Sequence, residues 1–189
     1  MDDKERFIDL LKATGREGID ELIDWYSTKT DFFSAPASSR YHGAAPGMLC
    51  KHSLNVHDCG MRIADMVEAD GKVKIDRVSL AIATLNHDAC KANFYTPKKK
   101  KRQNPQTGIW EFYDSYEIDE KFCFGGHGSK SVFLVQHFIK LTPEEGVAIN
   151  CHMGAWDGNT HVGDAYEQFP LAWIVHAADE MATYFYEKE

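Results

Sequence analysis

The segment from residue 49 to residue 66 carries a stripe of mostly apolar residues spaced three and four positions apart, as on one face of an α-helix. The stripe consists of Leu49, His52, Val56, Cys59, Ile63 and Met66. His52 is a polar residue within this otherwise largely apolar stripe. The spacing therefore predicts a helix that packs against other helices and turns an imidazole toward the protein interior.

Apolar residues recur at helical spacing along most of the remaining chain, which predicts an all-α fold. The other expected helices cover residues 5–14, 18–27, 76–88, 129–140, 142–152 and a last segment from 170 onward. Residues 142–145, Thr-Pro-Glu-Glu, have the arrangement of a capping box with Pro143 in the first helical position. Loops are expected over 28–48 and in the polar, glycine-containing stretch after residue 152.

Residues 92–126 interrupt the helical pattern. Residues 98–102 form a basic tract, 104–108 have turn chemistry, and 109–113 favour extended structure, so a small hairpin-like excursion is expected around 95–120. The basic tract is expected to be a solvated loop tip, with a contact to substrate phosphate or nucleic acid as the alternative. Packing within the hairpin, rather than base stacking, is expected of Trp110, Phe112, Tyr113 and Tyr116.

Length and composition indicate one globular domain, and we expect residues 1–189 to form it. The net charge of −8 argues against broad binding of phosphate backbones. The five cysteines are scattered and contain no C-x-x-C pair, which favours reduced thiols. We see no signal-peptide core and no apolar run of membrane length, so the chain is expected to be cytoplasmic and without a membrane partner.

Three separate predicted helices place groups that can bind a metal on apolar faces. His52 lies in the first stripe, His87 and Asp88 close the 76–88 helix, and Asp179 lies beside Ala178 in the last helix. A buried carboxylate is costly unless it is paired or bound to a metal. A bound metal would explain all three placements, since imidazole and carboxylate donors suit Mn, Fe, Co, Ni or Zn.

A single His-Asp pair has little weight, because the chain contains two of them. His57 follows His52 by five residues, or about 140° around a helix, so it cannot share the same face. We therefore expect His57 and Asp58 to lie at the surface. Ordinary surface or loop positions are also expected for His42, His137 and His161.

The ordered residues His52, His87-Asp88, His127, His152 and Asp179 resemble the H…HD…H…H…D pattern of the HD-domain phosphohydrolase superfamily. Residues 47–54 (GMLCKHSL) are similar to the family's G-G-L-L-x-H-S-L. Residues 85–91 (LNHDACK) are similar to L-x-H-D-I-G-K, with a cysteine at 90 in place of the usual glycine. Residues 126–128 and 151–154 are similar to the family's two intermediate histidine motifs, and residues 176–179 are similar to its closing H-x-x-D. The resemblance covers about residues 40–182 and implies a helical HD-domain bundle.

The resemblance also implies a divalent metal site with one or two ions per chain, drawn from Mn, Fe, Co, Ni, Zn and Mg. One ion would be held by His52, His87, Asp88 and Asp179. The two intermediate histidines, His127 and His152, are similar to those that complete a two-metal site in which the aspartate bridges both ions. Metal-activated water would then cleave the phosphate bond, and no protein nucleophile would be required.

Other roles in catalysis are expected close to this site. The resemblance implies catalytic roles for Asp88 and Lys91, with Lys91 as a contact to substrate phosphate. Lys130, one turn into the helix after His127, is a second candidate for a phosphate contact and completes the expected catalytic set. His176 would either donate a hydrogen bond that supports a ligand or contact substrate. Trp156 is a weaker candidate for the wall of a substrate pocket.

The function expected from this pattern is metal-dependent hydrolysis of a phosphate ester or anhydride of a nucleotide or deoxynucleotide, by an enzyme of the nucleotidase or nucleoside triphosphate hydrolase type. One alternative is a 3'–5' exonuclease acting on single-stranded nucleic acid, in which the basic tract at 98–102 would bind the strand. The other is a non-catalytic HD-type module that binds nucleotides. The expected partner is a small phosphate-bearing molecule, with nucleic acid less favoured. A homodimer is implied by the resemblance alone.

Overall fold

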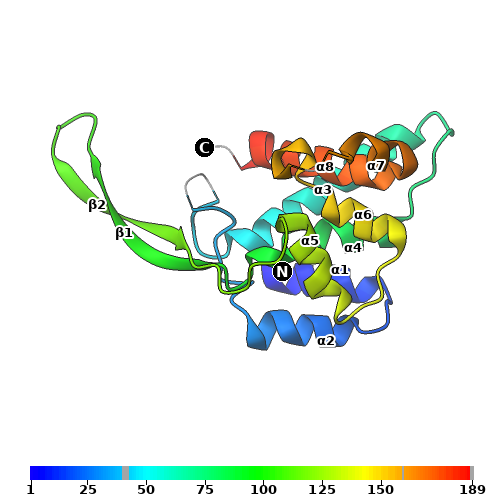
Figure 1. The fold of residues 1–189 in the computed structure, drawn as a ribbon, viewed down its shortest axis with the longest axis horizontal. Helices are drawn as coiled ribbons and strands as arrows, with labels where there is room; N and C mark the ends of the chain where they lie inside the picture. Colours follow the sequence, from blue (N-terminus) through cyan, green and yellow to red (C-terminus); the bar gives the residue numbers. More distant parts are fainter. Residues whose placement is uncertain (40–42, 159, 188–189) are drawn as a thin grey trace.

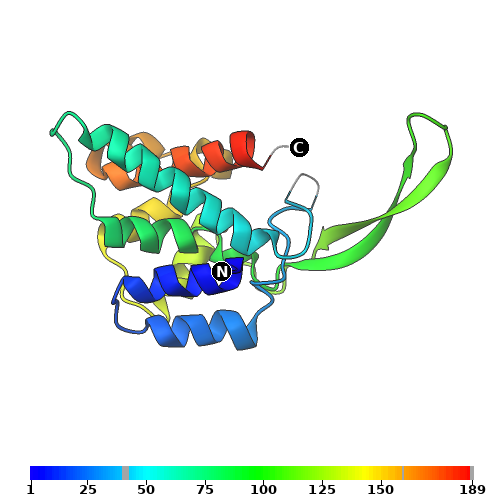
Figure 2. The ribbon, with the colours of Figure 1, turned by 180° about the vertical axis from the view of Figure 1, so that it is seen from behind.

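The computed structural model describes residues 1–39, 43–158 and 160–187, and its helices form one body from which a two-stranded ribbon projects (Figure 1). The view from behind shows the same separation of body and ribbon (Figure 2). The elements are α1 (Asp3–Ala13), α2 (Ile19–Asp24), η1 (Trp25–Lys29), α3 (Met48–Glu68), α4 (Arg77–Asn86), η2 (Ala89–Lys91), β1 (Tyr95–Gln103), β2 (Trp110–Ile118), α5 (His127–Gln136), α6 (Pro143–Asn150), η3 (Gly154–Asp157), α7 (Val162–Gln168), α8 (Pro170–Met181) and η4 (Ala182–Tyr186). The predicted helical class with one hairpin is confirmed.

Helix α3 is packed between α4 and α8, which makes it the centre of the body. Helix α6 contacts both α4 and α8, and α5 lies against α6 and the short 3₁₀ turn η2. The apolar stripe predicted along α3 is buried from Leu49 to Ile63, whereas Met66 in its last turn is 65% exposed. The interior of the body therefore lies around the inner faces of α3, α4, α6 and α8.

The first two helices support the end of α4. Phe7, Leu11 and Leu22 are fully buried in the common core, together with Tyr26 of the π-helical segment η1. The Tyr26 hydroxyl donates a hydrogen bond of 2.9 Å to Asn86 Oδ1. Since Asn86 directly precedes His87, this contact fixes the chain where the predicted ligands begin.

Helix α6 begins at the predicted capping box. Thr142 Oγ1 accepts a hydrogen bond from the Glu145 backbone N–H, and the Glu145 carboxylate accepts one from the Thr142 N–H. The same carboxylate is fully buried and also accepts hydrogen bonds from Arg16 and Ser79. One glutamate thus joins the start of α6 to the α1–α2 connection and to α4.

The hairpin predicted around 95–120 is confirmed, with β1 antiparallel to β2 from the pair Tyr95–Ile118 to the pair Gln103–Trp110. The basic tract is not a loop tip, as was expected, but part of β1, because residues 98–102 pair with 111–115. The expectation that the aromatic residues pack within the hairpin is wrong for Trp110 and Phe112. They are 66% and 65% exposed, because the hairpin projects from the body and lacks a second layer.

The structure corrects two other expectations. His57 is buried, not at the surface, because α4 covers the side of α3 next to the His52 face; its Nδ1 lies 3.2 Å from Thr84 Oγ1. Asp58 is half-buried and pairs with Arg6. The predicted loop after residue 152 contains the short helix α7.

Surface positions are confirmed for His137 and His161, while His42 lies outside the described residues. Among the helices in the described part of the chain, none has the length and apolar character needed to span a membrane.

Candidate metal centre

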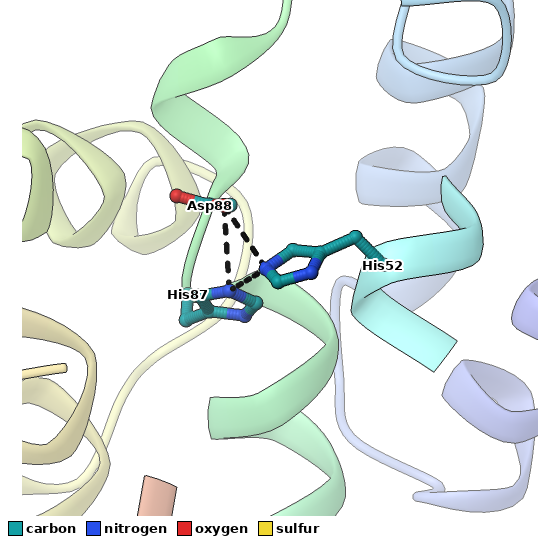
Figure 3. Close-up of side chains that lie close together, drawn as sticks. All are labelled: His52, His87 and Asp88. Atoms are coloured by element: carbon teal, nitrogen blue, oxygen red, sulfur yellow. Dashed lines mark hydrogen bonds and ion pairs between the residues drawn. The ribbon is translucent and has the colours of Figure 1, made fainter. Parts of the chain in front are cut away.

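The end of α4 brings two predicted ligands together. Helix α4 ends at Asn86, and His87 and Asp88 form the junction to η2. Asp88 leaves the helical conformation with φ −104° and ψ 22°. The junction faces the first turns of α3, where His52 lies on the buried stripe, as Figure 3 shows.

His52, His87 and Asp88 converge on one point (Figure 3). The Nε2 atoms of the two histidines are 3.2 Å apart. Asp88 Oδ2 lies 3.5 Å from Nε2 of His52 and 3.4 Å from Nε2 of His87. All three side chains are buried. Two imidazole nitrogens and one carboxylate oxygen at such mutual distances form a donor set that could hold a divalent metal ion.

Two further predicted ligands border this point. Asp179, from α8, places Oδ1 3.2 Å from His52 Nε2. His152, just after α6, places Nε2 3.6 Å from Asp88 Oδ1. The two oxygens of Asp88 therefore face different partners, with Oδ2 toward His52 and His87 and Oδ1 toward His152.

Each of the three buried histidines is oriented by a hydrogen bond at its other ring nitrogen. The Nδ1 of His87 donates to Thr84 O, and the Nδ1 of His152 donates to Ile149 O, both at 2.7 Å. The Nδ1 of His52 lies 2.9 Å from a carboxylate oxygen of Glu187. A proton at Nδ1 leaves the Nε2 lone pair of a neutral imidazole free, which is the arrangement of histidines that bind metals.

Two buried atoms in the cluster have no hydrogen-bond partner in the described part of the chain, Asp88 Oδ1 and His152 Nε2. Leaving such a group unsatisfied typically costs about 1–3 kcal/mol. Both atoms are acceptors when the imidazole carries its proton at Nδ1, so neither satisfies the other. A cation between them would satisfy both, and on this observation the residues present fit a bound metal.

A family model for the HD domain matches residues 49–184, which is most of the chain and includes all six predicted ligands. The chain belongs to the HD-domain family. A curated relative, the dihydroneopterin 2',3'-cyclic phosphate phosphodiesterase of Methanocaldococcus jannaschii, is 26% identical over 149 residues. The match covers 77% of this chain and 50% of the relative, so this chain spans about half of that protein's length. No solved structure matches the chain.

The electrostatics of this HD domain favour a cation. Burial opposes ionisation of Asp88 and Asp179. The Lys91 ammonium and His87 nevertheless hold the pKa of the Asp88 carboxyl group below its usual range. The hydrogen bond from His52, together with the nearby His87, does the same for the pKa of Asp179. Burial also lowers the pKa of the Lys91 ammonium, but Asp88 raises it overall. With Glu187, three carboxylates lie in or against the cluster, and a divalent ion would offset their negative charge.

His52 responds to this excess of negative charge. Burial lowers the pKa of its imidazole, but hydrogen bonds to Asp179 and Glu187 outweigh burial and raise it to about 10. A proton on His52 thus occupies the place that a metal would take.

His127 lies at the edge of the cluster, at the first position of α5. Its Nδ1 is 3.5 Å from the sulfur of Cys90, and burial lowers the pKa of its imidazole. Gly128 allows this position, because a Cβ there would lie 2.2 Å from the carbonyl oxygen of Asn150 at the end of α6. The imidazole lines the same cavity as His52 and Asp179.

The two predicted phosphate contacts differ in their surroundings. Lys91 Nζ lies 2.6 Å from Asp88 Oδ2, and the side chain lines the cavity. Lys130 is buried, donates to Glu120 Oε1 at 2.5 Å, and lies over the rings of Phe94 and Phe122. It is not among the described residues that line the cavity. The ion pair instead holds the connection after β2 against α5.

Two supporting residues complete the description. Glu187, after the π-helical segment η4, accepts hydrogen bonds from His52 and from Asn55 Nδ2, the latter at 2.9 Å. Sequence reasoning missed it, because it belongs to none of the recognised motifs. His176 donates from Nδ1 to the carbonyl oxygen of His152 at 2.7 Å, so it contacts the backbone of a predicted ligand.

A cavity of about 510 Å³ lies beside the cluster. Its lining includes His52, Lys91, His127, Asp179 and Glu187 of the cluster, Tyr95 and Ile118 of the hairpin, and Thr183 and Tyr184 of η4. Trp156, the weaker pocket candidate, is 81% exposed and is absent from the described lining. Three of the predicted ligands, His52, His127 and Asp179, therefore line a cavity whose wall also includes residues of the hairpin and of η4.

Proposed function

We propose that this HD domain is a metal-dependent phosphohydrolase that cleaves a phosphate ester or anhydride of a nucleotide or a nucleotide-like molecule. One observation carries the proposal. Three buried histidines are fixed at Nδ1 by hydrogen bonds and turn Nε2 toward Asp88. Such an arrangement has little purpose for packing alone, because it leaves buried acceptors facing one another.

In this proposal, His52, His87, Asp88 and Asp179 hold the first divalent ion. Asp88, His152 and His127 would hold a second one. The donors suit Mn, Fe, Co, Ni or Zn, and Mg remains an alternative. A bound ion of this kind polarises a phosphoryl oxygen and lowers the pKa of a water molecule enough for it to attack phosphorus near neutral pH.

The chain's own residues would bind and orient the phosphate. The Lys91 ammonium stays charged because Asp88 raises its pKa, and it lines the cavity, so it can attract a phosphoryl oxygen. Asp88 holds this ammonium beside the histidines at 2.6 Å. Lys130 would contribute indirectly, since its ammonium already binds Glu120.

The proposed substrate class rests on the size of the cavity and on the substrate named for the curated relative. A cavity of about 510 Å³ has the size of a small-molecule site. The relative's name describes a cyclic phosphodiester of a pterin, a small phosphate-bearing molecule. We therefore propose small nucleotides and cyclic phosphodiesters as the first substrates to test. A purely binding function is disfavoured, because every ligand position of the HD pattern is occupied by a residue that can bind metal.

The experiment is a hydrolysis assay on a panel of nucleoside mono- and triphosphates, 2',3'-cyclic nucleotides and bis(p-nitrophenyl) phosphate, each with Mn²⁺, Co²⁺, Ni²⁺ or Mg²⁺. Nucleotide products are separated by chromatography, and p-nitrophenol is followed by its absorbance. We expect metal-dependent turnover of at least one compound and its loss, by about 1,000-fold or more, in Asp88→Ala, since one residue would serve both ions. Asp9→Ala is the matched control, because Asp9 is exposed on α1. No turnover of any compound, or equal turnover in both variants, would contradict the proposal.

A further inference from the structure

The hairpin has two different faces. Because side chains alternate along a strand and paired residues share a side, ten residues form one of them. This aromatic face consists of Tyr95, Pro97, Lys99, Lys101 and Gln103 from β1 and of Trp110, Phe112, Asp114, Tyr116 and Ile118 from β2. The opposite face carries the remaining strand residues, including Lys98, Arg102, Glu111 and Glu117.

The aromatic face begins inside the candidate site. Its innermost pair, Tyr95 and Ile118, lines the same cavity as three of the predicted metal ligands, His52, His127 and Asp179. Its outermost pair, Gln103 and Trp110, lies at the far end of the ribbon, away from the helical body (Figure 1). Nine residues of extended strand span roughly 30 Å. The face is therefore a continuous surface from the cavity to the tip of the hairpin.

Exposed rings on β2 lie beside lysines on β1 along this surface. Trp110 and Phe112 are 66% and 65% exposed, and Lys101 Nζ lies 4.8 Å from the centre of the Phe112 ring. Successive side chains on one face are about 7 Å apart, which is roughly two base-stacking steps. The space between neighbouring rings thus fits one planar base.

The charges on the two faces are arranged differently. On the opposite face, Lys98 pairs with Glu117, and Arg102 pairs with Glu111. On the aromatic face, Lys99 has only a loose contact of 3.9 Å with Asp114, whose side chain is 91% exposed. Within the described residues, Lys101 has no carboxylate within ion-pair distance. Lys100, on the opposite face, is half-buried and donates a hydrogen bond to the carbonyl oxygen of Tyr116. The exposed lysines without a close carboxylate partner in the described hairpin are therefore Lys99 and Lys101, beside the exposed rings.

The hairpin also differs in charge from the rest of the chain. Residues 95–118 contain five cations and three carboxylates, a net charge of +2, whereas the whole chain carries −8. The remaining residues therefore carry −10. A polyanion would be attracted to the hairpin and repelled elsewhere, so it would be confined to the one surface that leads into the cavity.

We propose that the aromatic face binds a single-stranded nucleic acid whose terminal nucleotide enters the cavity. The inference rests on the proposed function and names the substrate class of that site. Exposed rings on β2 stack on bases, and the lysines on the neighbouring strand β1 bind the phosphates, as in proteins that bind single strands without reading their sequence. Lysines at the centre of the surface disfavour a protein partner, because lysine is depleted from protein–protein interfaces.

The reaction that follows is hydrolysis of the terminal phosphodiester. One water molecule adds to phosphorus, and the P–O bond to the neighbouring nucleotide breaks. The products are one mononucleotide and a strand shortened by one residue, with the proton of water passed to the leaving oxygen. No oxidant, reductant or other co-reactant is needed.

The test measures fluorescence anisotropy of fluorescein-labelled single-stranded DNA and RNA of about 12 nucleotides, with Asp88→Ala as the background to prevent cleavage. We expect Lys99→Ala/Lys101→Ala to weaken binding at least about 10-fold, with a shallower salt dependence. Trp110→Ala and Phe112→Ala should each weaken it by about 5- to 150-fold. The matched control, Lys98→Ala/Arg102→Ala, removes the same charge from the opposite face and should bind within about 2-fold of the background protein.

The same hairpin changes in the otherwise wild-type chain should leave turnover of bis(p-nitrophenyl) phosphate unchanged, because they lie outside the cavity. If no protein hydrolyses this ester but strand binding follows the predicted pattern, the proposed hydrolase function fails and the binding surface stands. Absence of binding, or an equal loss in both double variants, overturns the surface. The proposal is also overturned if analytical ultracentrifugation shows a dimer that Trp110→Ala and Phe112→Ala dissociate, while strand binding stays unchanged.

Discussion

At the scale of single residues, the site depends on which nitrogen of each histidine carries the proton. The sequence pattern predicted His52, His87 and His152 as ligands, but it contained no information on their orientation. His87 and His152 are each oriented by the backbone carbonyl three residues earlier in the chain. Such local contacts follow from helix geometry. For His52 the partner is Glu187, which is 135 residues away, so only the folded chain reveals it.

This arrangement predicts that Glu187→Gln lowers metal affinity by about 10- to 100-fold, the usual effect of losing a carboxylate that orients a metal-binding histidine. The glutamine keeps the size of the side chain but loses its charge. Affinity would be measured by competition with a fluorescent chelator. Glu187→Asp should restore part of the affinity, and Glu167→Gln, an exposed change in α7, should have no effect. Unchanged affinity in Glu187→Gln would show that Glu187 only fills space.

At the scale of helices and strands, periodicity predicted the elements with buried faces and missed those without. Helix α7 has seven residues and no buried side chain, so its sequence gives no amphipathic signal. Strand β1 was hidden in a run of lysines, which have low strand propensity; its pairing with β2 determines its conformation. The capping box of α6 was visible in the sequence, but the contacts of Glu145 with Arg16 and Ser79 were not.

Those contacts predict a stability effect far from the metal centre. Arg16→Ala leaves the fully buried Glu145 carboxylate without its cation and should lower the free energy of unfolding by about 3 kcal/mol, the lower end for a broken buried pair, since Arg16 is partly exposed. Urea denaturation would measure it. Arg102→Ala breaks an exposed pair and should cost less than about 1 kcal/mol. Equal effects of the two changes would show that the Glu145 network does not stabilise the fold.

At the scale of the whole molecule, the chain surrounds an acidic centre with histidines and leaves a cavity beside it. The order of the motifs predicted which residues lie close together. That prediction came from the resemblance to a known family, because helix periodicity alone does not say which helix faces meet. The distances, the unsatisfied atoms of Asp88 and His152, and the cavity wall formed by the hairpin and η4 come from packing between segments far apart in sequence. Together these features form a donor set that could hold a cation.

The measurement that tests this account most directly is the metal content of the protein after incubation with Mn²⁺ and desalting, determined by elemental analysis for wild type, Asp88→Ala and the control Asp9→Ala. The account predicts one or two ions per chain in wild type and control and almost none in Asp88→Ala. Thermal unfolding should agree, with a stabilisation of about 2.7 kcal/mol when free metal exceeds the dissociation constant 100-fold. Equal metal content in all three proteins, or none in wild type without any thermal stabilisation, would contradict the metal centre.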